Sequence, residues 1–257
     1  MGRLPGGRAV LSGHWADAYF GDLYYESVAD LLTARLSSFE AVLIRRLMGL
    51  GPGDRVLDLA CGHGRHARAL SPEVALLVGV DRNPDYLARA QGSGALRVRG
   101  DLRTLPLRDR AFDAAFSWYS SLFMYGDEEN ERVLAGVVRT LRRGGRLLVH
   151  HDNPLRLARE PGAHAEWDLA GGGRVEEDSR FDPAAGVDVC ARRVIRPDGT
   201  VLAGTARLRY YTPKEWEALA RRVGLRMTSI TSSWQAGGTP DSLDDAPDLI
   251  ALAEKVE

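Results

Sequence analysis

A glycine-rich stretch at residues 56–67 is the part of the sequence best suited to hold a ligand against the backbone. Its Gly62, Gly64 and Ala67 fit the spacing G-x-G-x-x-G/A. Glycine at the turn between a strand and a helix lets a ligand approach closely, because no Cβ atom intervenes. Dinucleotide-binding turns share this spacing, and so do tight turns that bind nothing. The stretch therefore predicts a ligand-binding turn without identifying the ligand.

Three carboxylates lie at the carboxyl ends of the first three predicted strands. Asp58 belongs to the strand that leads into the glycine turn, Asp81 ends the second apolar run, and Asp101 follows the third. Open α/β sheets bind ligands at this edge. Asp81 can accept hydrogen bonds from both hydroxyls of a ribose, or it could only cap the helix that follows at Asn83. Asp101 could receive an adenine amino group or only cap a turn.

Together these segments resemble the class I S-adenosylmethionine-dependent methyltransferases. The first motif of that family resembles residues 58–64, and its Leu-x-x-Gly-Gly segment resembles residues 141–145. Its acidic second and third strand ends match Asp81 and Asp101, and its fourth strand resembles residues 112–117. The resemblance covers about residues 24–254. It implies an α/β fold with a Rossmann-like, doubly wound seven-stranded sheet, helices on both faces, and a strand inserted antiparallel at the edge.

The resemblance also implies S-adenosylmethionine as the cofactor. Asp58 would orient the turn, or the cofactor ammonium group through water, rather than act as a base. His63 departs from the Thr or Ser that is commoner at that position in the family. Residues 120–125 and 209–213 resemble a bacterial branch that acts on small molecules. The residues expected to bind the cofactor are Tyr24, Asp58, Ala60, Cys61, Gly62, Gly64, Arg65, Asp81, Arg82, Asp101, Leu102, Ser117 and Tyr119.

Two adjacent histidines are the candidates for a catalytic base. Methyl transfer needs the in-line approach of a nucleophile to an activated carbon, so a protein can act mainly by positioning and by excluding water. A hydroxyl acceptor benefits from a general base, whereas an amine needs only to be neutral. His150 and His151 end the fifth predicted strand. Successive strand residues face opposite sides of a sheet, so at least one of the two is expected to pack or cap instead.

Aromatic residues and one arginine are the candidates for contacting the acceptor. Trp118 follows the fourth predicted strand, Trp167 lies beyond the fifth, and Tyr211 precedes the last predicted helix. Such rings could line an apolar pocket or attract the sulfonium through cation–π contact, and they could equally pack a lid against the core. Arg209, among several arginines of the same region, could pair with an acceptor carboxylate, although strand arginines are usually solvated.

The hydrophobic pattern predicts the elements that must hold these residues. Residues 1–50 are expected to form a loose tail and a helical cap, with helical spacing over residues 15–50. Residues 51–257 are expected to form a methyltransferase domain, with a small antiparallel β insertion after strand five at about residues 155–210. Gly144-Gly145 predicts the end of a helix, and Thr212 predicts the capped start of another. The predicted strands are residues 55–59, 75–80, 96–98, 112–117, 146–149, 174–181, 187–196, 201–210, 225–233 and 249–254.

The composition bounds the class of protein. The 257 residues include 34 Lys+Arg and 35 Asp+Glu, for a net charge of −1, which argues against affinity for nucleic acid. The two cysteines are too few for a disulfide framework, and the spacing of His and acidic residues predicts no metal site. No apolar run approaches the roughly 18 residues that span a bilayer, and the first residues lack a secretory segment. We therefore expect a cytoplasmic protein with no membrane partner.

The sequence as a whole predicts an enzyme that transfers a methyl group from S-adenosylmethionine to a nitrogen or oxygen of a small-molecule acceptor. One alternative is an NAD-dependent oxidoreductase. Asp58 and Asp101 disfavour it, and the only lysines, Lys214 and Lys255, lie too late for a Tyr-x-x-x-Lys pair. The other alternative is a protein that binds S-adenosylmethionine without chemistry. The oligomeric state stays open.

Overall fold

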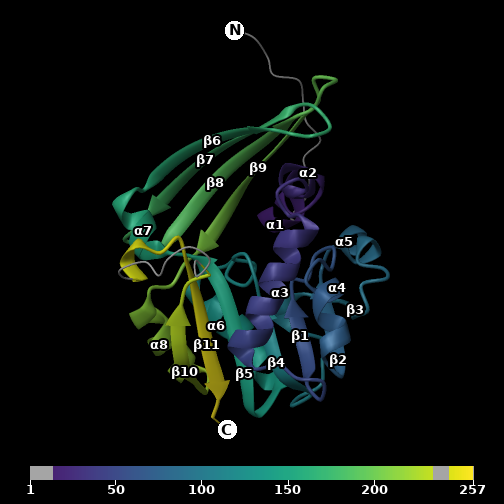
Figure 1. The fold of residues 1–257 in the computed structure, drawn as a ribbon. Helices are drawn as coiled ribbons and strands as arrows, with labels where there is room; N and C mark the ends of the chain where they lie inside the picture. Colours follow the sequence, from purple (N-terminus) through teal and green to yellow (C-terminus); the bar gives the residue numbers. More distant parts are fainter. Residues whose placement is uncertain (1–13, 234–242, 257) are drawn as a thin grey trace.

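The computed structural model describes residues 14–233 and 243–256 (Figure 1). Most of the predicted N-terminal tail, residues 1–13, lies outside the described residues. Within the described ranges, no helix is long and apolar enough to cross a lipid bilayer. The predicted boundary between the helical cap and the methyltransferase domain at residue 51 stays a prediction.

The larger sheet, sheet A, has seven strands in the order β10-β11-β5-β4-β1-β2-β3. β1 to β5 run parallel, and β11 lies antiparallel between β5 and β10. This confirms the predicted doubly wound, Rossmann-like sheet with its antiparallel edge. The strands are β1 Arg55–Leu59, β2 Leu76–Asp81, β3 Leu96–Arg99, β4 Phe112–Ser117, β5 Leu141–Asp152, β10 Leu225–Thr231 and β11 Asp248–Lys255.

Helices cover both faces of sheet A because its central strands are apolar on both sides. Val56 packs in a core with Ile44 of α3 (Ala34–Met48), whereas the next residue, Leu57, packs with Leu134 of α6 (Asp127–Thr140). Neighbouring strand residues point to opposite faces, so one strand supplies two cores. α8 (Pro213–Arg222) covers the same face as α6. The shorter helices near the strand ends are α4 Ala67–Leu70, α5 Pro84–Arg89 and α7 Pro154–Arg159.

The chain enters β5 differently from the prediction. α6 ends at Thr140, and β5 begins at once with Leu141, which pairs with Phe112. The register then shifts, so that Ala114 pairs with Arg146. Gly144 has φ +70° inside this irregular segment. The glycines thus form a bulge within a longer strand, and their interpretation as a simple helix stop was wrong. The capping box predicted at Thr212 of α8 is present.

A second sheet, sheet B, stands above the carboxyl ends of sheet A (Figure 1). It is antiparallel, in the order β6-β7-β8-β9. The predicted insertion strands are present, and β6 is an additional strand that the sequence analysis missed. Its residues are almost all exposed, so no buried alternation marks it. The strands are β6 Gly162–Asp168, β7 Arg174–Asp182, β8 Val187–Ile195 and β9 Val201–Arg209.

The N-terminal helices join sheet B to sheet A. The region predicted as helical is divided into α1 (Trp15–Tyr19), α2 (Asp22–Val28) and α3, with Thr33 capping α3. Tyr19 and Leu23 pack against Val175 and Val194 of sheet B. α3 instead packs on sheet A. The N-terminal segment therefore lies over the edge of sheet A where the predicted site residues gather.

Candidate functional site

The glycine turn after β1 is held tightly against the end of β2. Gly62 and Gly64 have φ of +56° and +72°, and a Cβ atom on Gly64 would lie 3.0 Å from the Cβ of Ala90. The Cys61 amide donates to the carbonyl of Val80 at 3.0 Å. Only glycine adopts this backbone without strain and fits this space. The turn therefore presents its backbone at the edge of the sheet, as its composition predicts.

Asp81 connects this turn to the helix that follows β2. Its carboxylate accepts from the Gly62 amide at 2.9 Å and from the Asn83 amide at 2.8 Å. Burial raises the pKa of Asp81, against the lowering effect of these backbone donors. Asn83, through its own side chain, is the N-cap of α5. Capping is thus the task of Asn83, and the Asp81 carboxylate keeps lone pairs for a ligand.

Asp58 is a buried carboxylate whose charge is not balanced by a hydrogen bond to Oδ2. It is 3% exposed, and no group in the described part of the chain donates to Oδ2. Burial raises the pKa of Asp58 from 3.8 to about 8, partly offset by the charge of Arg65. A buried carboxylate in this state is costly to ionise unless a cation approaches it. The site therefore suits a ligand that brings a positive charge to Asp58.

Asp101 is already paired within the protein. It accepts from the Arg103 amide at 2.9 Å and from Nη2 of the same arginine at 2.6 Å. The hydrogen bond from the Arg103 side chain lowers the pKa of Asp101. Asp101 is also the N-cap of a short 3-10 helix, Leu102–Thr104. It still borders the cavity described next, so the turn-capping role and a ligand contact are compatible.

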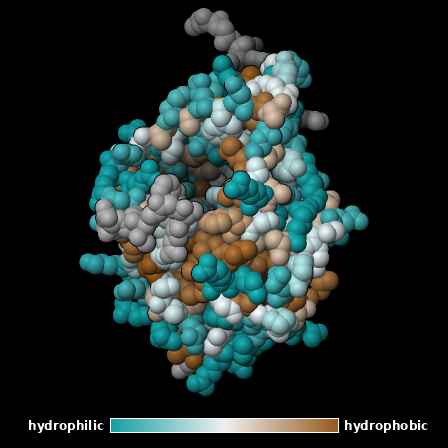
Figure 2. Space-filling view, in the orientation of Figure 1, coloured by the Kyte–Doolittle hydropathy of each residue, from teal (hydrophilic) through white to brown (hydrophobic). Residues whose placement is uncertain are grey.

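A cavity of about 890 Å³ opens along this edge of sheet A. Figure 2 shows a hollow near the middle of this face of the molecule. The structure brings most of the predicted cofactor residues to the cavity wall, together with residues of α1 and α2. Those on the wall are Tyr24, Asp58, Ala60, Cys61, Gly62, Arg65, Asp81, Arg82, Asp101, Leu102 and Tyr119, with Trp118 from the predicted acceptor set. Gly64 and Ser117 are not among the residues of the wall.

Buried polar atoms without a hydrogen-bond partner gather at the same place. Buried polar groups are paired in native proteins almost without exception, so such atoms indicate a ligand when they cluster. They come from β1, the glycine turn, and the residues at the ends of β2 and β4. Within the described residues they are Asp58 Oδ2, Arg65 Nη2, Arg82 Nη1, Ser117 Oγ and Trp118 Nε1.

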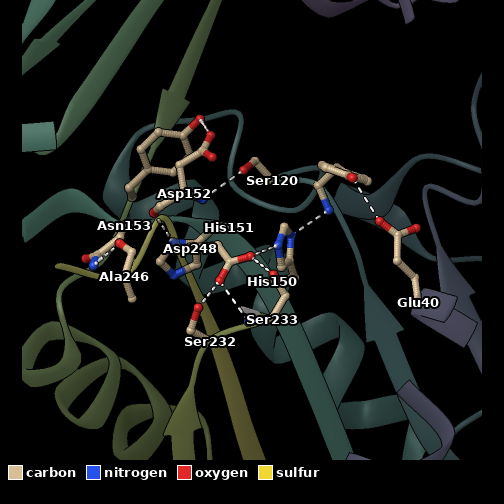
Figure 3. Close-up of polar contacts among 12 residues, drawn as sticks. Glu40, Ser120, His150, His151, Asp152, Asn153, Ser232, Ser233, Ala246 and Asp248 are labelled. Carbon is tan, nitrogen blue, oxygen red and sulfur yellow. Dashed lines mark hydrogen bonds and ion pairs between the residues drawn. The ribbon is translucent and has the colours of Figure 1, made fainter. Parts of the chain in front are cut away.

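Glu40 is a residue of this site that the sequence analysis missed. It lies on α3, is 4% exposed, and accepts from the Tyr119 hydroxyl at 2.8 Å (Figure 3). Its other oxygen pairs with Arg65 and, at 3.0 Å, with Nε2 of His66. Burial raises its pKa, but His66 and Arg65 outweigh that effect and lower the pKa to about 2. The available signal was its helical spacing, since Glu40 shares the buried face of α3 with Ile44.

His150 braces the corner after β4. Its Nδ1 accepts from the Tyr119 amide at 3.1 Å, and its Nε2 lies 3.0 Å from Oδ2 of Asp248 (Figure 3). The ring also stacks on Trp118, with centroids 4.5 Å apart. Tyr119 and Ser120 both have positive φ, 58° and 56°, which non-glycine residues adopt only when their surroundings hold them. Both ring nitrogens are engaged, so the His150 contacts are those of a brace rather than of a free base.

His151 points to the opposite side of the strand and is fully buried. Its Nδ1 donates to the carbonyl of Asp152 at 2.7 Å, and its Nε2 accepts from the Trp216 indole at 2.7 Å. Burial lowers its pKa to about 4, so the ring is neutral at physiological pH. Since His151 does not border the cavity, the structure keeps it away from the other predicted site residues.

The remaining candidates for acceptor contact lie away from the cavity wall. Trp167 donates to the carbonyl of Ser27 at 3.0 Å and packs between sheet B and the N-terminal helices. Arg209 pairs with Asp127 at 2.9 Å and with Glu215 at 2.5 Å, and its guanidinium lies over the Tyr211 ring. These contacts fasten the end of β9 to α6 and α8.

No group of three His, Cys, Asp or Glu side chains that could hold a metal ion occurs among residues 14–233 and 243–256. His63 and His66, three residues apart, are not joined by further ligands there. Burial lowers the pKa of each to about 4. His63 borders the cavity and His66 contacts Glu40. Both are therefore neutral polar groups of the wall.

Comparison with known proteins shows which proteins this chain is similar to. Residues 56–145 match the family described as "Methyltransferase domain". A demethylmenaquinone methyltransferase of Corynebacterium kroppenstedtii is 32% identical over 125 residues, which are 49% of this chain and 53% of the relative. The chain spans about half the length of the curated relatives it matches.

Solved structures agree over nearly the whole chain. The CcbJ methyltransferase of Streptomyces caelestis has a TM-score of 0.74 at 20% identity, covering 91% of this chain and 98% of that one. An amino pentose methyltransferase of Micromonospora echinaspora with S-adenosylmethionine bound has a TM-score of 0.62 at 20% identity, covering 98% and 100%. Residues 56–145 thus match a methyltransferase domain, and the chain has the class I fold of S-adenosylmethionine-dependent methyltransferases.

Proposed function

We propose that this protein transfers a methyl group from S-adenosylmethionine to a nitrogen or oxygen of a small-molecule acceptor. The observation that carries the proposal is the set of charged groups around the glycine turn. Asp81 has spare lone pairs, and neither Asp58 Oδ2 nor Arg65 Nη2 has a hydrogen-bond partner among the described residues. These groups match the ribose, ammonium and carboxylate of one amino-acid nucleoside.

The residues fit the cofactor end by end. Asp81 would accept from the ribose hydroxyls, and Asp101 and Leu102 would lie on the adenine side. Asp58 would balance the ammonium group, which relieves the cost of its buried charge. Arg65 would pair with the methionine carboxylate through Nη2. An NAD molecule has no ammonium and carboxylate to match Asp58 and Arg65, so these two residues favour S-adenosylmethionine over a dinucleotide.

Positioning is the proposed means of catalysis. The cofactor supplies a methyl group on a sulfonium, which is already activated for displacement. Tyr24, Trp118 and Tyr119 would exclude water and hold the methyl carbon in line with the acceptor atom. Their rings can also attract the sulfonium charge. Both ring nitrogens of His150 and of His151 form hydrogen bonds within the protein. This favours catalysis by orientation of the acceptor over base catalysis by either ring.

We propose that the acceptor is a small molecule and that it does not need to carry a negative charge. Relatives named for a menaquinone precursor and for an amino pentose support the small-molecule class. Several arginines of the insertion are paired with carboxylates, as Arg192 is with Glu177 and Arg193 with Glu176, which argues against a strongly basic acceptor surface there. The same pairing supports a function without nucleic acid. Free thiols at Cys61 and Cys190 suit a reducing, cytoplasmic compartment.

Calorimetric titration with S-adenosylmethionine, S-adenosylhomocysteine and NAD tests the proposal directly. We expect the first two to bind and NAD to bind weakly or not at all. Binding of NAD alone would refute the proposal. Binding of S-adenosylmethionine with no methyl uptake by any member of a broad metabolite panel would instead support a binding protein without chemistry.

A further inference from the structure

We propose that Glu40 is a positioning residue that aims Arg65 at the carboxylate of the cofactor. The inference rests on the proposed function and adds to it a residue from outside the glycine turn. Glu40 does not need to touch the cofactor for this role. It would determine how well the protein distinguishes a nucleoside that carries the amino-acid end from one that lacks it.

The first argument is that the two terminal nitrogens of the Arg65 guanidinium have different surroundings. Nη1 pairs with Glu40 and donates to the Ser37 hydroxyl at 3.3 Å, so this nitrogen is occupied by α3. Nη2 has no hydrogen-bond partner within residues 14–233 and 243–256, although the side chain is only 10% exposed. The Arg65 guanidinium also lies 4.9 Å from the centroid of the Tyr119 ring. The guanidinium is therefore fixed by α3 and the β4 corner, with one nitrogen left for a ligand.

The second argument is that Glu40, on α3, joins two further segments at one carboxylate. Arg65 and His66 are consecutive residues at the end of the glycine-rich stretch, and Tyr119 follows β4. His66 is neutral at physiological pH because burial lowers its pKa to about 4. The negative charge of Glu40 therefore faces one positive partner, Arg65. A planar guanidinium held by a carboxylate on one edge presents its other edge in a fixed direction.

The third argument is energetic. A buried arginine without an ionic partner would be expensive, and a flexible one would lose conformational entropy on binding. Glu40 removes both costs before the cofactor arrives, because the pair forms within the protein itself. The remaining free energy of the Arg65–carboxylate contact then appears as affinity for the amino-acid end of the cofactor.

The experiment compares two ligands that differ only in that end. S-adenosylhomocysteine carries the amino acid, whereas 5′-methylthioadenosine has the same thioether nucleoside without it. Calorimetry gives both dissociation constants for the wild-type protein, for Glu40→Gln and for Glu40→Asp. The second variant keeps the negative charge and shortens its reach by one methylene, so it tests the proposal even if loss of the charge unfolds the chain. Glu26→Gln is the matched control, because Glu26 pairs with Arg196 and neither residue borders the cavity.

We expect both Glu40 variants to bind S-adenosylhomocysteine about tenfold more weakly or worse and to bind 5′-methylthioadenosine within about twofold of wild type. Glu26→Gln should bind both as wild type does. Equal weakening of the two ligands, or no change in either, would overturn the role of Glu40. Failure of the wild-type protein to bind either ligand would overturn the proposed function instead, so the two failures are distinguishable.

Discussion

The cavity edge of sheet A and the surface of sheet B are both rich in charge, but their charged groups are paired differently. In sheet B, Arg192 pairs with Glu177 and Arg193 with Glu176. At the cavity edge of sheet A, the buried atoms Asp58 Oδ2 and Arg65 Nη2 have no hydrogen-bond partner among the residues that the structure describes. Evolution can leave a buried polar group unpaired where a ligand completes it. On the proposed function, unsatisfied polar atoms indicate the site better than the number of charged residues does.

The largest effect on this contrast is expected from the removal of the Asp81 carboxylate. In Asp81→Ala, the ribose hydroxyls lose a charged acceptor and the Gly62 amide loses its partner. We expect affinity for S-adenosylhomocysteine to fall by about a hundredfold, the equivalent of one or two charge-assisted hydrogen bonds. Calorimetry measures it. The control is Glu176→Ala in sheet B, which should bind as wild type, and unchanged affinity in Asp81→Ala would remove Asp81 from the site.

The next effect concerns the buried carboxyl group of Asp58, whose pKa is raised by burial. The folded protein keeps Asp58 protonated up to about pH 8, whereas the unfolded chain releases that proton near its ordinary value of 3.8. The stability of the unliganded protein should therefore fall as the pH rises between those values. Asp58→Asn should remove this loss and raise the melting temperature at pH 9, by about 2–4 °C for each kcal/mol relieved.

The same variant should bind S-adenosylhomocysteine about tenfold more weakly, because the ammonium group loses its counter-charge. Thermal melting with and without ligand separates the two effects. A lower melting temperature at pH 9 together with unchanged affinity would contradict a ligand role for Asp58.

A smaller effect, on the pH dependence of stability, is expected at His151, which is the histidine of the pair that packs away from the cavity. Its pKa of about 4 lies below the ordinary 6.5, so the unfolded chain binds a proton between those values and the folded protein does not. Stability should thus be present above pH 6.5 and be lost as the pH falls towards 4. Denaturant unfolding at pH 7 and pH 5 should show a loss of about 1–2 kcal/mol from this residue.

In His151→Gln that part of the loss should disappear, while the affinity for S-adenosylhomocysteine at pH 7 stays unchanged. A pH dependence identical to that of the wild-type protein would show that His151 titrates normally in the folded state, and its assignment as a packing residue would then be wrong.

The smallest effect is expected for the partly exposed ion pair that joins α2 to the end of β8. Arg196 and Glu26 are each about one-third exposed, so solvent screens their interaction. Arg196→Ala should change the free energy of unfolding by less than about 1 kcal/mol and leave ligand affinity unaltered. A loss of affinity would show that this ion pair affects ligand binding at the cavity edge of sheet A. The contrast between the two regions would then be weaker.

The sequence predicts sheet A well because its strands carry their own signal. β1 and β4 occur at the predicted residues, since apolar runs buried on both faces differ from the segments around them. β6 was missed because its residues are exposed on both sides. Glu40 was missed because a carboxylate on an amphipathic helix is usually solvated.

The hydrogen bonds of the two histidines and the ion pairs of Arg209 could not be predicted either, and the reason is different. His150 contacts Asp248, which lies 98 positions further along the chain, and Arg209 pairs with Asp127, 82 positions earlier. Residue type shows that such a side chain can bind, donate or titrate. Only the folded arrangement shows whether a distant partner already occupies it.

The position of Glu40 on α3 has a consequence for the exchange of domains between this chain and its relatives. The segment that matches the methyltransferase family, residues 56–145, contains Arg65 and the residues proposed to bind the nucleoside, but not α3. On the proposed role of Glu40, binding of the amino-acid end of the cofactor depends on a helix that precedes that segment. A catalytic core transplanted without its own α3 would keep the pocket for the nucleoside and lose its discrimination at the other end, so exchange of domains between relatives should preserve the helix and the turn as one unit.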